Sequence, residues 1–430
     1  MKTFSWAKLS EPKRAALLKR PALARSARLQ EDVSRIVNAV RARGDAAVRD
    51  FTRRFDKVSL EKLEVSSVEM RRALKTVAPE VLRALRLAAK RVRKFHAAQR
   101  PRDLKVEISA GTVCERRFLP IEKVGLYVPG GTAVLPSTVI MLGVPAALAG
   151  CPVKILATPP RADGSVDPHV LAAASVVGIS RVFAIGGAQA IGAMAYGTKS
   201  VPKVDKIFGP GNSWVTEAKM QAARDPEGAA CDLPAGPTEV LVIAGGGADA
   251  EFIASDLLAQ AEHGRDSQVV LVAPSTTLAG RVLAEVSRQL SDLPRRDIAA
   301  AALKNSFAVI VPDLRTAFEV SNRYAPEHLI LHVKNPRSWT SLVRHAGSVF
   351  LGPWSPEAAG DYASGTNHVL PTYGFARAYG GLIFESFLKP ITFQELSRKG
   401  LESIGPAVEL LASIERLDGH RLSIARRLAR

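Results

Sequence analysis

Residues 239–272 read EVLVIAGGGADAEFIASDLLAQAEHGRDSQVVLV, and this stretch decides the fold class. An apolar run at 239–243 is followed by Asp249, a residue type that often caps helices, and a second apolar run follows at 269–272. Buried strands separated by a helix are typical of parallel sheets that are covered on both faces. The stretch therefore predicts a strand–helix–strand unit of the α/β class.

The same alternation continues on both sides of this unit. Further strands are predicted at 124–128, 153–157, 182–185, 206–208, 307–311, 329–333 and 348–351, with a helix at 276–290. Residues 1 to about 105 have apolar residues at three- and four-residue spacing, which predicts helices, and the chain after about 390 is again predicted to be helical. A chain of 430 residues is too long for one simple core, so the two blocks predict two α/β domains with mostly parallel sheets.

The composition is that of a globular protein, with 47% apolar and 23% charged residues. No apolar run reaches the roughly 18 residues that a membrane helix needs. Charged residues interrupt the first 20 positions, where a secretory signal would have an apolar run. These observations predict a cytoplasmic protein without membrane contact.

The three cysteines, Cys114, Cys151 and Cys231, lie far apart and form no CxxC pair. This distribution argues against a disulfide scaffold and against a thiolate zinc site. The net charge of +18 leaves nucleic-acid binding open as an alternative. Basic residues such as those at 83–94 are interleaved with apolar residues on a predicted helix, however, which favours a solvated helix face and no nucleic-acid partner.

Glycine-rich turns follow two of the predicted strands, at 186–189 and 209–212. Neither turn matches the GxGxxG fingerprint of dinucleotide-binding domains. Taken alone, each turn is more typical of an ordinary α/β connection than of a nucleotide cradle. The pattern by itself does not indicate NAD.

Gln260 and His263 stand near the end of the helix predicted within 239–272, with Gly264 placed as its C-terminal cap. Residues three apart share one face of a helix, and the negative end of the helix dipole favours a cation. The pair is therefore a candidate for two ligands of one metal ion. The alternative, a solvated polar patch at a helix end, is favoured when this segment is taken alone.

Two polar segments follow later in the chain. The loop 360–368 contains Asp361, a candidate oxygen ligand, and His368, a candidate substrate contact; an ordinary Asp-led turn is an equal alternative. Glu327 and His328 precede a strand and combine two groups suited to proton transfer. Neighbours on a strand point to opposite faces, so both serve one site only if the turn at Pro326 redirects one of them; a polar strand entrance is the alternative.

Glu415 and His420 lie at the end of a predicted C-terminal helix. Their five-residue spacing fits one helix face less well than a spacing of three or four. Taken alone, this segment is more typical of a helix end at which His420 interacts with the dipole.

Taken together, these segments resemble the histidinol dehydrogenase family. The resemblance covers nearly the whole chain and is weakest in about the first hundred residues. Its most specific stretches are Lys206 to Lys219 (KIFGPGNSWVTEAK), Asp232 to Ile243 (DLPAGPTEVLVI), Ala259 to Gly264 (AQAEHG), Ala325 to Leu329 (APEHL) and Gly347 to Tyr373 (GSVFLGPWSPEAAGDYASGTNHVLPTY).

The resemblance implies roles for individual residues. It implies a zinc ion held by Gln260, His263, Asp361 and His420. It implies that Glu327 and His328 are catalytic, and that Tyr127, Gln189 and Asn212 contact NAD. The implied substrate contacts are Thr238, Gln260, His263, Glu327, His328, Asp361, His368, Glu415 and His420. Thr238 stands where some members have Ser, and because the hydroxyl is kept we expect this contact to survive.

The resemblance also implies an architecture of two incomplete Rossmann-like domains with small helical ends. The expected division is an N-terminal helical segment at 1–25, a first α/β domain at 26–126 and 239–385, a second at 127–238, and a C-terminal helical arm at 386–430. Family members form intertwined homodimers. Since His420 lies on the terminal arm, we expect an active site shared between two chains.

The implied reaction is the oxidation of L-histidinol through L-histidinaldehyde to L-histidine, with two NAD and with zinc as a substrate anchor. An ordinary zinc alcohol dehydrogenase is a rival interpretation, but it would need thiolate ligands and a GxGxxG domain. An inactive relative is a second rival, and the presence of every polar site position argues against it. A basic nucleic-acid-binding protein is a third, separable by a salt titration of duplex binding.

Overall fold

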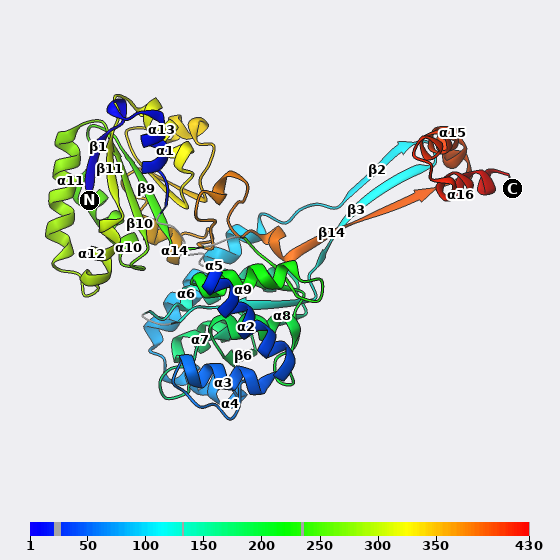
Figure 1. The fold of residues 1–430 in the computed structure, drawn as a ribbon, viewed down its shortest axis with the longest axis horizontal. Coiled ribbons are helices and arrows are strands. Elements are labelled where there is room, and N and C mark those ends of the chain that lie inside the picture. The colour runs from blue at the N-terminus through cyan, green and yellow to red at the C-terminus, as the bar shows by residue number, and fades with distance from the viewer. Residues whose placement is uncertain (21–26, 131–132, 234–235, 430) are drawn as a thin grey trace.

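The computed structural model describes residues 1–20, 27–130, 133–233 and 236–429. These residues form two parallel sheets, each covered by helices, and a long antiparallel arm that projects away from them (Figure 1). The α/β class predicted from the sequence is therefore confirmed. No helix in the described ranges combines the length and the apolar character needed to span a membrane.

The first parallel sheet has six strands in the order β1-β11-β10-β9-β12-β13. Its strands are β1 (Lys2–Ser5), β9 (Glu239–Ala244), β10 (Gln268–Ala273), β11 (Phe307–Ile310), β12 (His328–His332) and β13 (Ser348–Leu351). Its helices are α1 (Glu11–Leu17), α10 (Ala250–Ala261), α11 (Thr276–Leu290), α12 (Arg296–Lys304), α13 (Leu314–Tyr324) and α14 (Glu357–Tyr362). Alternate residues of β9 enter different cores, because Val240 and Val242 pack with α10–α12 whereas Leu241 and Ile243 pack with α13.

The second parallel sheet has five strands in the order β6-β5-β4-β7-β8. Its strands are β4 (Lys123–Tyr127), β5 (Val153–Thr158), β6 (Arg181–Ala184), β7 (Lys206–Phe208) and β8 (Ala230–Cys231). Helices α4 (Ser67–Thr76), α5 (Pro79–Ala97), α6 (Pro136–Ala149) and α7 (Pro168–Val176) form one core with it. Helices α2 (Ala27–Arg43), α3 (Asp45–Phe55), α8 (Gly187–Tyr196) and α9 (Ser213–Arg224) form the other.

The arm consists of the antiparallel strands β2 (Leu104–Ser109), β3 (Thr112–Pro120) and β14 (Leu388–Leu396), which carry α15 (Arg398–Ile414) and α16 (Asp418–Leu428). Figure 1 shows both helices at the far end of the arm, distant from the two parallel sheets. Every residue of β2 is exposed. Strand β2 therefore lengthens the arm without placing a buried side chain in a core of the described residues.

The nine strands predicted between residues 124 and 351 all occur, within a residue or two of the predicted bounds. Three other expectations need correction. Residues 1–25 are not wholly helical, because β1 adds to the sheet edge beside β11, where Phe4 contacts Phe307. The C-terminal arm is not wholly helical, because β14 pairs with β3.

The third correction concerns the helices between residues 27 and 97. The expected grouping placed them with 239–385, yet α2–α5 pack on the sheet of β4–β8. Val37 and Val40, for example, share a core with Phe183 and Ile191. The physical reason is that the apolar faces of these helices fit the faces of the second sheet, which sequence periodicity does not specify. The expected boundary at 25/26 lies outside the described residues.

Candidate active site

The amino ends of β9 and β12 meet the carboxyl ends of β4 and β7 around a cavity of ≈ 220 Å³. From the first sheet it is lined by Thr238, His263, Glu327, His328, Asp361 and His368. From the second sheet come Pro129, Thr138, Pro210 and Gly211. We call it the catalytic cavity. Glu327 and His328 both line it, so the turn at Pro326 does bring these neighbours into one site.

The imidazole of His328 is buried at the first position of β12. Its Nδ1 lies 3.1 Å from the backbone oxygen of Glu239, to which it donates when protonated at Nδ1. Its Nε2 is buried without a hydrogen-bond partner among the described residues. Burial lowers the pKa of His328 to about 4, so the ring is neutral near pH 7 and Nε2 is available as a proton acceptor.

Glu327 is held by the backbone of the same residue, Glu239. Its Oε2 accepts hydrogen bonds from the Thr238 hydroxyl at 2.6 Å and from the Glu239 N–H at 2.9 Å. Burial raises the pKa of Glu327 well above its usual value, and the two hydrogen bonds oppose this effect. The backbone of Glu239 thus orients both candidate catalytic side chains.

Glu239 is itself held by Arg20, which sequence reasoning did not identify. The Arg20 guanidinium donates to both carboxylate oxygens of Glu239, at 2.8 and 2.7 Å, and stacks on the Tyr324 ring. Both charged side chains are nearly inaccessible, so each compensates the buried charge of the other. The pair is separated by 219 residues, and no local pattern indicates it.

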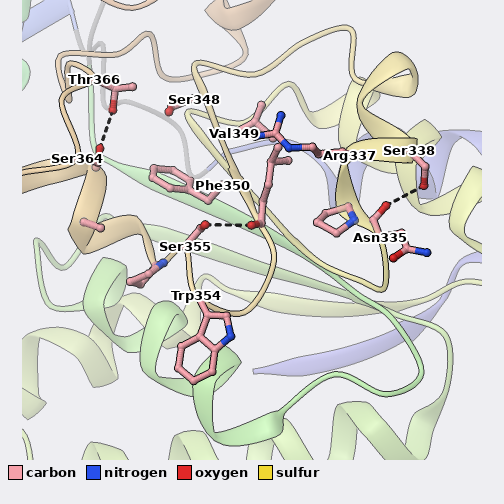
Figure 2. A pocket seen from close by; sticks show the side chains of 15 residues that line it. Asn335, Arg337, Ser338, Ser348, Val349, Phe350, Trp354, Ser355, Ser364 and Thr366 are labelled. Carbon is pink, nitrogen blue, oxygen red and sulfur yellow. Dashed lines mark hydrogen bonds between the residues drawn. The ribbon is translucent and has the colours of Figure 1, made fainter. Parts of the chain in front are cut away.

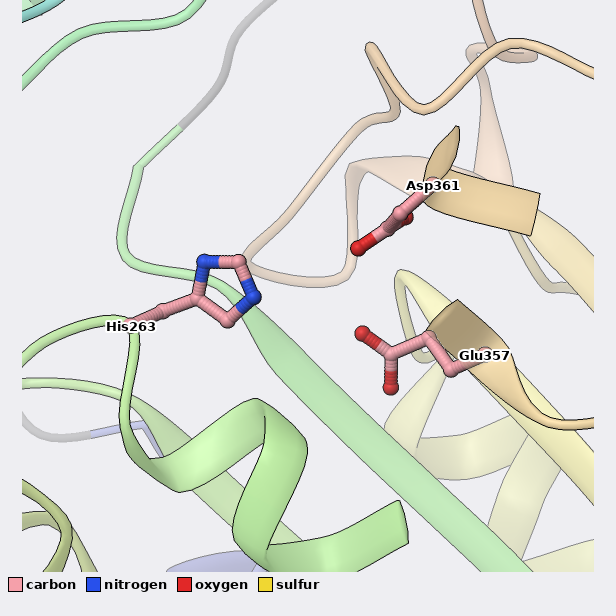
Figure 3. Close-up of side chains that lie close together, drawn as sticks. All are labelled: His263, Glu357 and Asp361. Atoms are coloured by element: carbon pink, nitrogen blue, oxygen red, sulfur yellow. The ribbon is translucent and has the colours of Figure 1, made fainter. Parts of the chain in front are cut away.

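A possible metal site lies at one side of the catalytic cavity. Ligand atoms of His263, Glu357 and Asp361 all lie within 4.8 Å of one another, and Figure 3 shows the three side chains converging. One imidazole and two carboxylates form an oxygen–nitrogen donor set that suits zinc. Glu357 was missed by sequence reasoning, although its four-residue spacing from Asp361 on a helix was a usable signal.

Gln260 is fully buried beside this group. Its amide lies 2.5 Å from Thr238 Oγ1 and, with the nitrogen facing Glu357, donates to Oε2 of that carboxyl group at 2.7 Å. The helix α10 ends at Ala261, and its C-cap is Glu262, so the prediction of Gly264 as the cap is wrong. Gly264 also lacks the positive φ that a glycine cap commonly adopts. His263 therefore lies just beyond the helix, although its N–H still reaches the Gln260 carbonyl at 3.3 Å.

His368 links the two sheets across the catalytic cavity. Its Nδ1 lies 2.8 Å from the Asp361 backbone oxygen, and its Nε2 lies 3.2 Å from the Thr138 hydroxyl on α6. These contacts fix the ring at the cavity wall. His368 thus lies where a substrate contact was predicted.

A second cavity, of ≈ 410 Å³, contains all three predicted NAD contacts, Tyr127, Gln189 and Asn212. Its other lining residues include Ile36, Phe55, Asp56, Gly130 and Trp214. We call it the dinucleotide cavity. It adjoins the catalytic cavity, because Gly130 and Asn212 directly follow Pro129 and Gly211 in the chain. The strand order reverses between β4 and β7, and the carboxyl ends at such a switch point commonly bind ligands.

Glu415 and His420 do not reach the catalytic cavity within this chain. His420 is an exposed residue of α16, and Glu415 follows the last residue of α15 at the end of the arm (Figure 1). The described chain thus assembles seven of the nine predicted substrate contacts and leaves these two apart.

A third cavity, of ≈ 720 Å³, lies along the edge strand β13 (Figure 2). It contains none of the predicted site residues, and Arg337 is the charged residue among its described lining. The largely exposed Trp354 stands at this cavity and contacts Phe252 at 5.8 Å between ring centroids. It lacks the acid–base groups of the catalytic cavity.

The fold and the two adjoining cavities are those of an α/β protein with buried acid–base groups beside a second pocket of ≈ 410 Å³. A family model described as histidinol dehydrogenase matches residues 18–428. The chain therefore belongs to the histidinol dehydrogenase family, which makes it an oxidoreductase of histidine biosynthesis.

Individual relatives agree with this assignment. The chain is 51% identical over 428 residues to the histidinol dehydrogenase of Vibrio parahaemolyticus, covering 100% of this chain and 98% of that one. It is 53% identical to that of Xanthomonas oryzae pv. oryzae, with 100% and 99% covered. The crystal structure of histidinol dehydrogenase from Elizabethkingia anophelis superimposes with a TM-score of 0.95 at 44% identity, with 100% and 98% covered.

Proposed function

We propose that this chain oxidises L-histidinol to L-histidine through L-histidinaldehyde in two successive NAD-dependent steps, the last of histidine biosynthesis. The observation that carries the proposal is the buried Nε2 of His328, which has no hydrogen-bond partner among the described residues, lies 3.8 Å from Asp361 Oδ1 and belongs to a ring lining the catalytic cavity. NAD supplies the hydride acceptor in both steps, and the chain supplies position and proton transfer.

In the first step, Nε2 of His328 accepts the alcohol proton as hydride leaves the carbon. The bond from Nδ1 to the Glu239 carbonyl keeps Nδ1 protonated, so the positive charge that develops on the ring is stabilised by a fixed dipole. The product is the aldehyde, which stays in the cavity for the second step.

In the second step, water adds to the aldehyde carbon, and Glu327 removes a proton from that water. The Thr238 hydroxyl and the Glu239 N–H hold Glu327 in place, and their hydrogen bonds favour its ionised form. Once His328 has released the first proton to solvent, its Nε2 accepts a proton from the hydrate as the second hydride passes to a second NAD. One site thus performs both oxidations without moving the substrate.

Zinc would be held by Gln260, His263 and Asp361 of one chain and by His420 of a second copy. The convergence of His263, Asp361 and the buried Glu357 supports a cation here. The carboxyl groups of Glu327, Glu357 and Asp361 lie close together and would repel one another when ionised, so a cation would stabilise them. When bound, zinc would anchor the substrate amine and imidazole, and its contribution would be orientation.

A homodimer completes the site in this proposal. The arm exposes large apolar side chains, which include Leu104, Val106, Ile108, Phe393, Leu410, Leu411, Ile414 and Leu417. Apolar area of this kind marks a protein interface. A second copy would cover it and would bring its Glu415 and His420 to the catalytic cavity.

NAD is proposed for the dinucleotide cavity. The N-termini of α8 and α9 both border it, at Gly187 and Asn212. Helix N-termini carry partial positive charge, which favours a pyrophosphate. The Tyr127 hydroxyl accepts the Gly187 N–H at 3.0 Å and so fixes one of these turns.

The test is NADH formation from three substrates: histidinol, histidinaldehyde and an amino alcohol without an imidazole. We expect two NADH per histidinol, one per histidinaldehyde and negligible turnover of the plain amino alcohol. One NADH per histidinol, with release of the aldehyde, would contradict the two-step proposal.

A further inference from the structure

The carboxylate of Asp56 is an unexplained group in the dinucleotide cavity. Asp56 directly follows α3 and lines this cavity together with Tyr127, Gln189 and Asn212. Its Oδ2 is buried and has no hydrogen-bond partner among the described residues. An oxygen of this kind is rare in folded proteins and calls for an explanation.

The position of Asp56 is unfavourable for a negative charge. It stands at the C-terminal end of α3, where the helix dipole is negative. Burial raises its pKa to about 6. The protein therefore retains a carboxylate, ionised above that pH, whose hydrogen-bond donors are not supplied by neighbouring side chains.

The two adjoining cavities fix which part of the cofactor Asp56 faces. The nicotinamide must reach the catalytic cavity, so it enters past Pro129 and Gly211. Ile36, Phe55 and Asp56 line the dinucleotide cavity and do not line the catalytic one. They come from α2 and the end of α3, neither of which lines the catalytic cavity, so we assign them to the adenosine half, where the Phe55 and Trp214 rings, 6.5 Å apart, offer an apolar rim to the adenine.

We propose that Asp56 accepts hydrogen bonds from the hydroxyl groups of the adenosine ribose and so selects NAD over NADP. This inference rests on the proposed NAD dependence. A carboxylate accepts a ribose hydroxyl well, whereas it repels the 2′-phosphate of NADP. Asp56 thus performs the task of the acidic residue that accompanies the GxGxxG fingerprint in ordinary dinucleotide domains, although this chain lacks that fingerprint.

The test compares binding and turnover of NAD, NADP and 2′-deoxy-NAD by the whole enzyme. For the unaltered enzyme we expect kcat/KM to fall at least about tenfold when the 2′-hydroxyl is missing, since a hydrogen bond to a charged group has this worth. Asp56→Asn should weaken NAD binding, measured by calorimetry, about tenfold. The variant enzyme should also prefer NAD over NADP less strongly than the unaltered enzyme does. Its affinities for NAD and 2′-deoxy-NAD should be more nearly equal.

Asp50→Asn is the matched control, because Asp50 lies on the same helix and pairs with Arg43 outside the cavity. It should keep the cofactor preference of the unaltered enzyme. The inference is overturned if the unaltered enzyme treats NAD and 2′-deoxy-NAD alike, or if Asp56→Asn weakens NAD and NADP equally. The 2′-deoxy comparison needs no variant, so it decides even if Asp56→Asn misfolds. No NADH from histidinol in the unaltered enzyme would instead remove the proposed function.

Discussion

The two parallel sheets bury their apolar side chains within the chain, whereas the arm leaves many of its apolar side chains exposed. Each parallel sheet has a core on both faces, and together the sheets bring Thr238, His263, Glu327, His328 and Asp361 to one cavity. The arm instead exposes β2 entirely and holds Glu415 and His420 far from that cavity. We call the two parallel sheets with their helices the body. The body buries its own cores, and in our proposal the arm contributes to the site only where it meets the body of another chain.

The largest expected effect concerns the metal. If zinc anchors the substrate as proposed, a chelator should abolish histidinol oxidation, and added zinc should restore it. His263→Asn should lower metal content and activity in proportion, as measured by elemental analysis and NADH formation. Full activity in a preparation shown to be free of metal would remove the anchoring role.

The next effect separates the two catalytic side chains of the body. Glu327→Gln should slow aldehyde oxidation by about 10²–10⁴-fold, the usual worth of a general base, and alcohol oxidation far less. His328→Asn should slow both steps, since a proton leaves in each. Single-turnover rates with histidinol and with histidinaldehyde give the comparison. An equal loss of both steps in Glu327→Gln would overturn its assignment to water activation.

A stability effect follows from the ion pair beneath the site. Arg20→Met leaves the buried Glu239 carboxylate without its partner, which should lower the free energy of unfolding by about 3–5 kcal/mol. Arg53→Met, which breaks an exposed pair with Asp50, is the control and should cost about 0–1 kcal/mol. Urea unfolding measures both. Equal losses would mean that the Arg20–Glu239 pair does not stabilise the body.

The smallest effect on the fold is expected in the arm. Leu411→Glu places a charge on the exposed apolar face of α15, so it should shift the dimer toward monomer without lowering the melting temperature of the body. Glu402 lies two and a half turns earlier on the same helix and so on its opposite face, and Glu402→Gln should leave the proposed dimer intact. Sedimentation at several concentrations measures the shift. An unchanged dimer in Leu411→Glu would place the interface elsewhere.

The body was more predictable from the sequence than the arm. The strands of 239–272 could be predicted because both are short apolar runs that are fully buried in a parallel sheet. The helix between them begins at a cap, Asp249, that is visible in the sequence. Strand β14 could not, because it pairs with β3 about 270 residues away and most of its side chains are exposed. Its pattern therefore lacks the alternation of buried and exposed residues that marks a half-buried strand.

The site divides in the same way. Glu327 and His328 lie at the start of a strand, where function concentrates, and Asp361 lies in the short helix α14 beside the polar segment 363–368; all three could be singled out. Arg20 and Glu239 could not, because a buried ion pair is recognised by its partners in space, whereas Glu357 was missed although its spacing from Asp361 was a usable signal. The role proposed for Asp56 likewise depends on the cavity that it lines, which the sequence does not reveal.

The central claim, a site shared by the body of one chain and the arm of another, is tested most directly by complementation. His263→Ala and His420→Ala variants, each inactive alone, are unfolded and refolded together. Random mixing makes about half of the dimers heterodimers, and each then holds one site with both histidines intact, so about a quarter of all sites should regain activity. A mixture shown to contain heterodimers that regains no activity would place His420 in the site of its own chain and contradict the account.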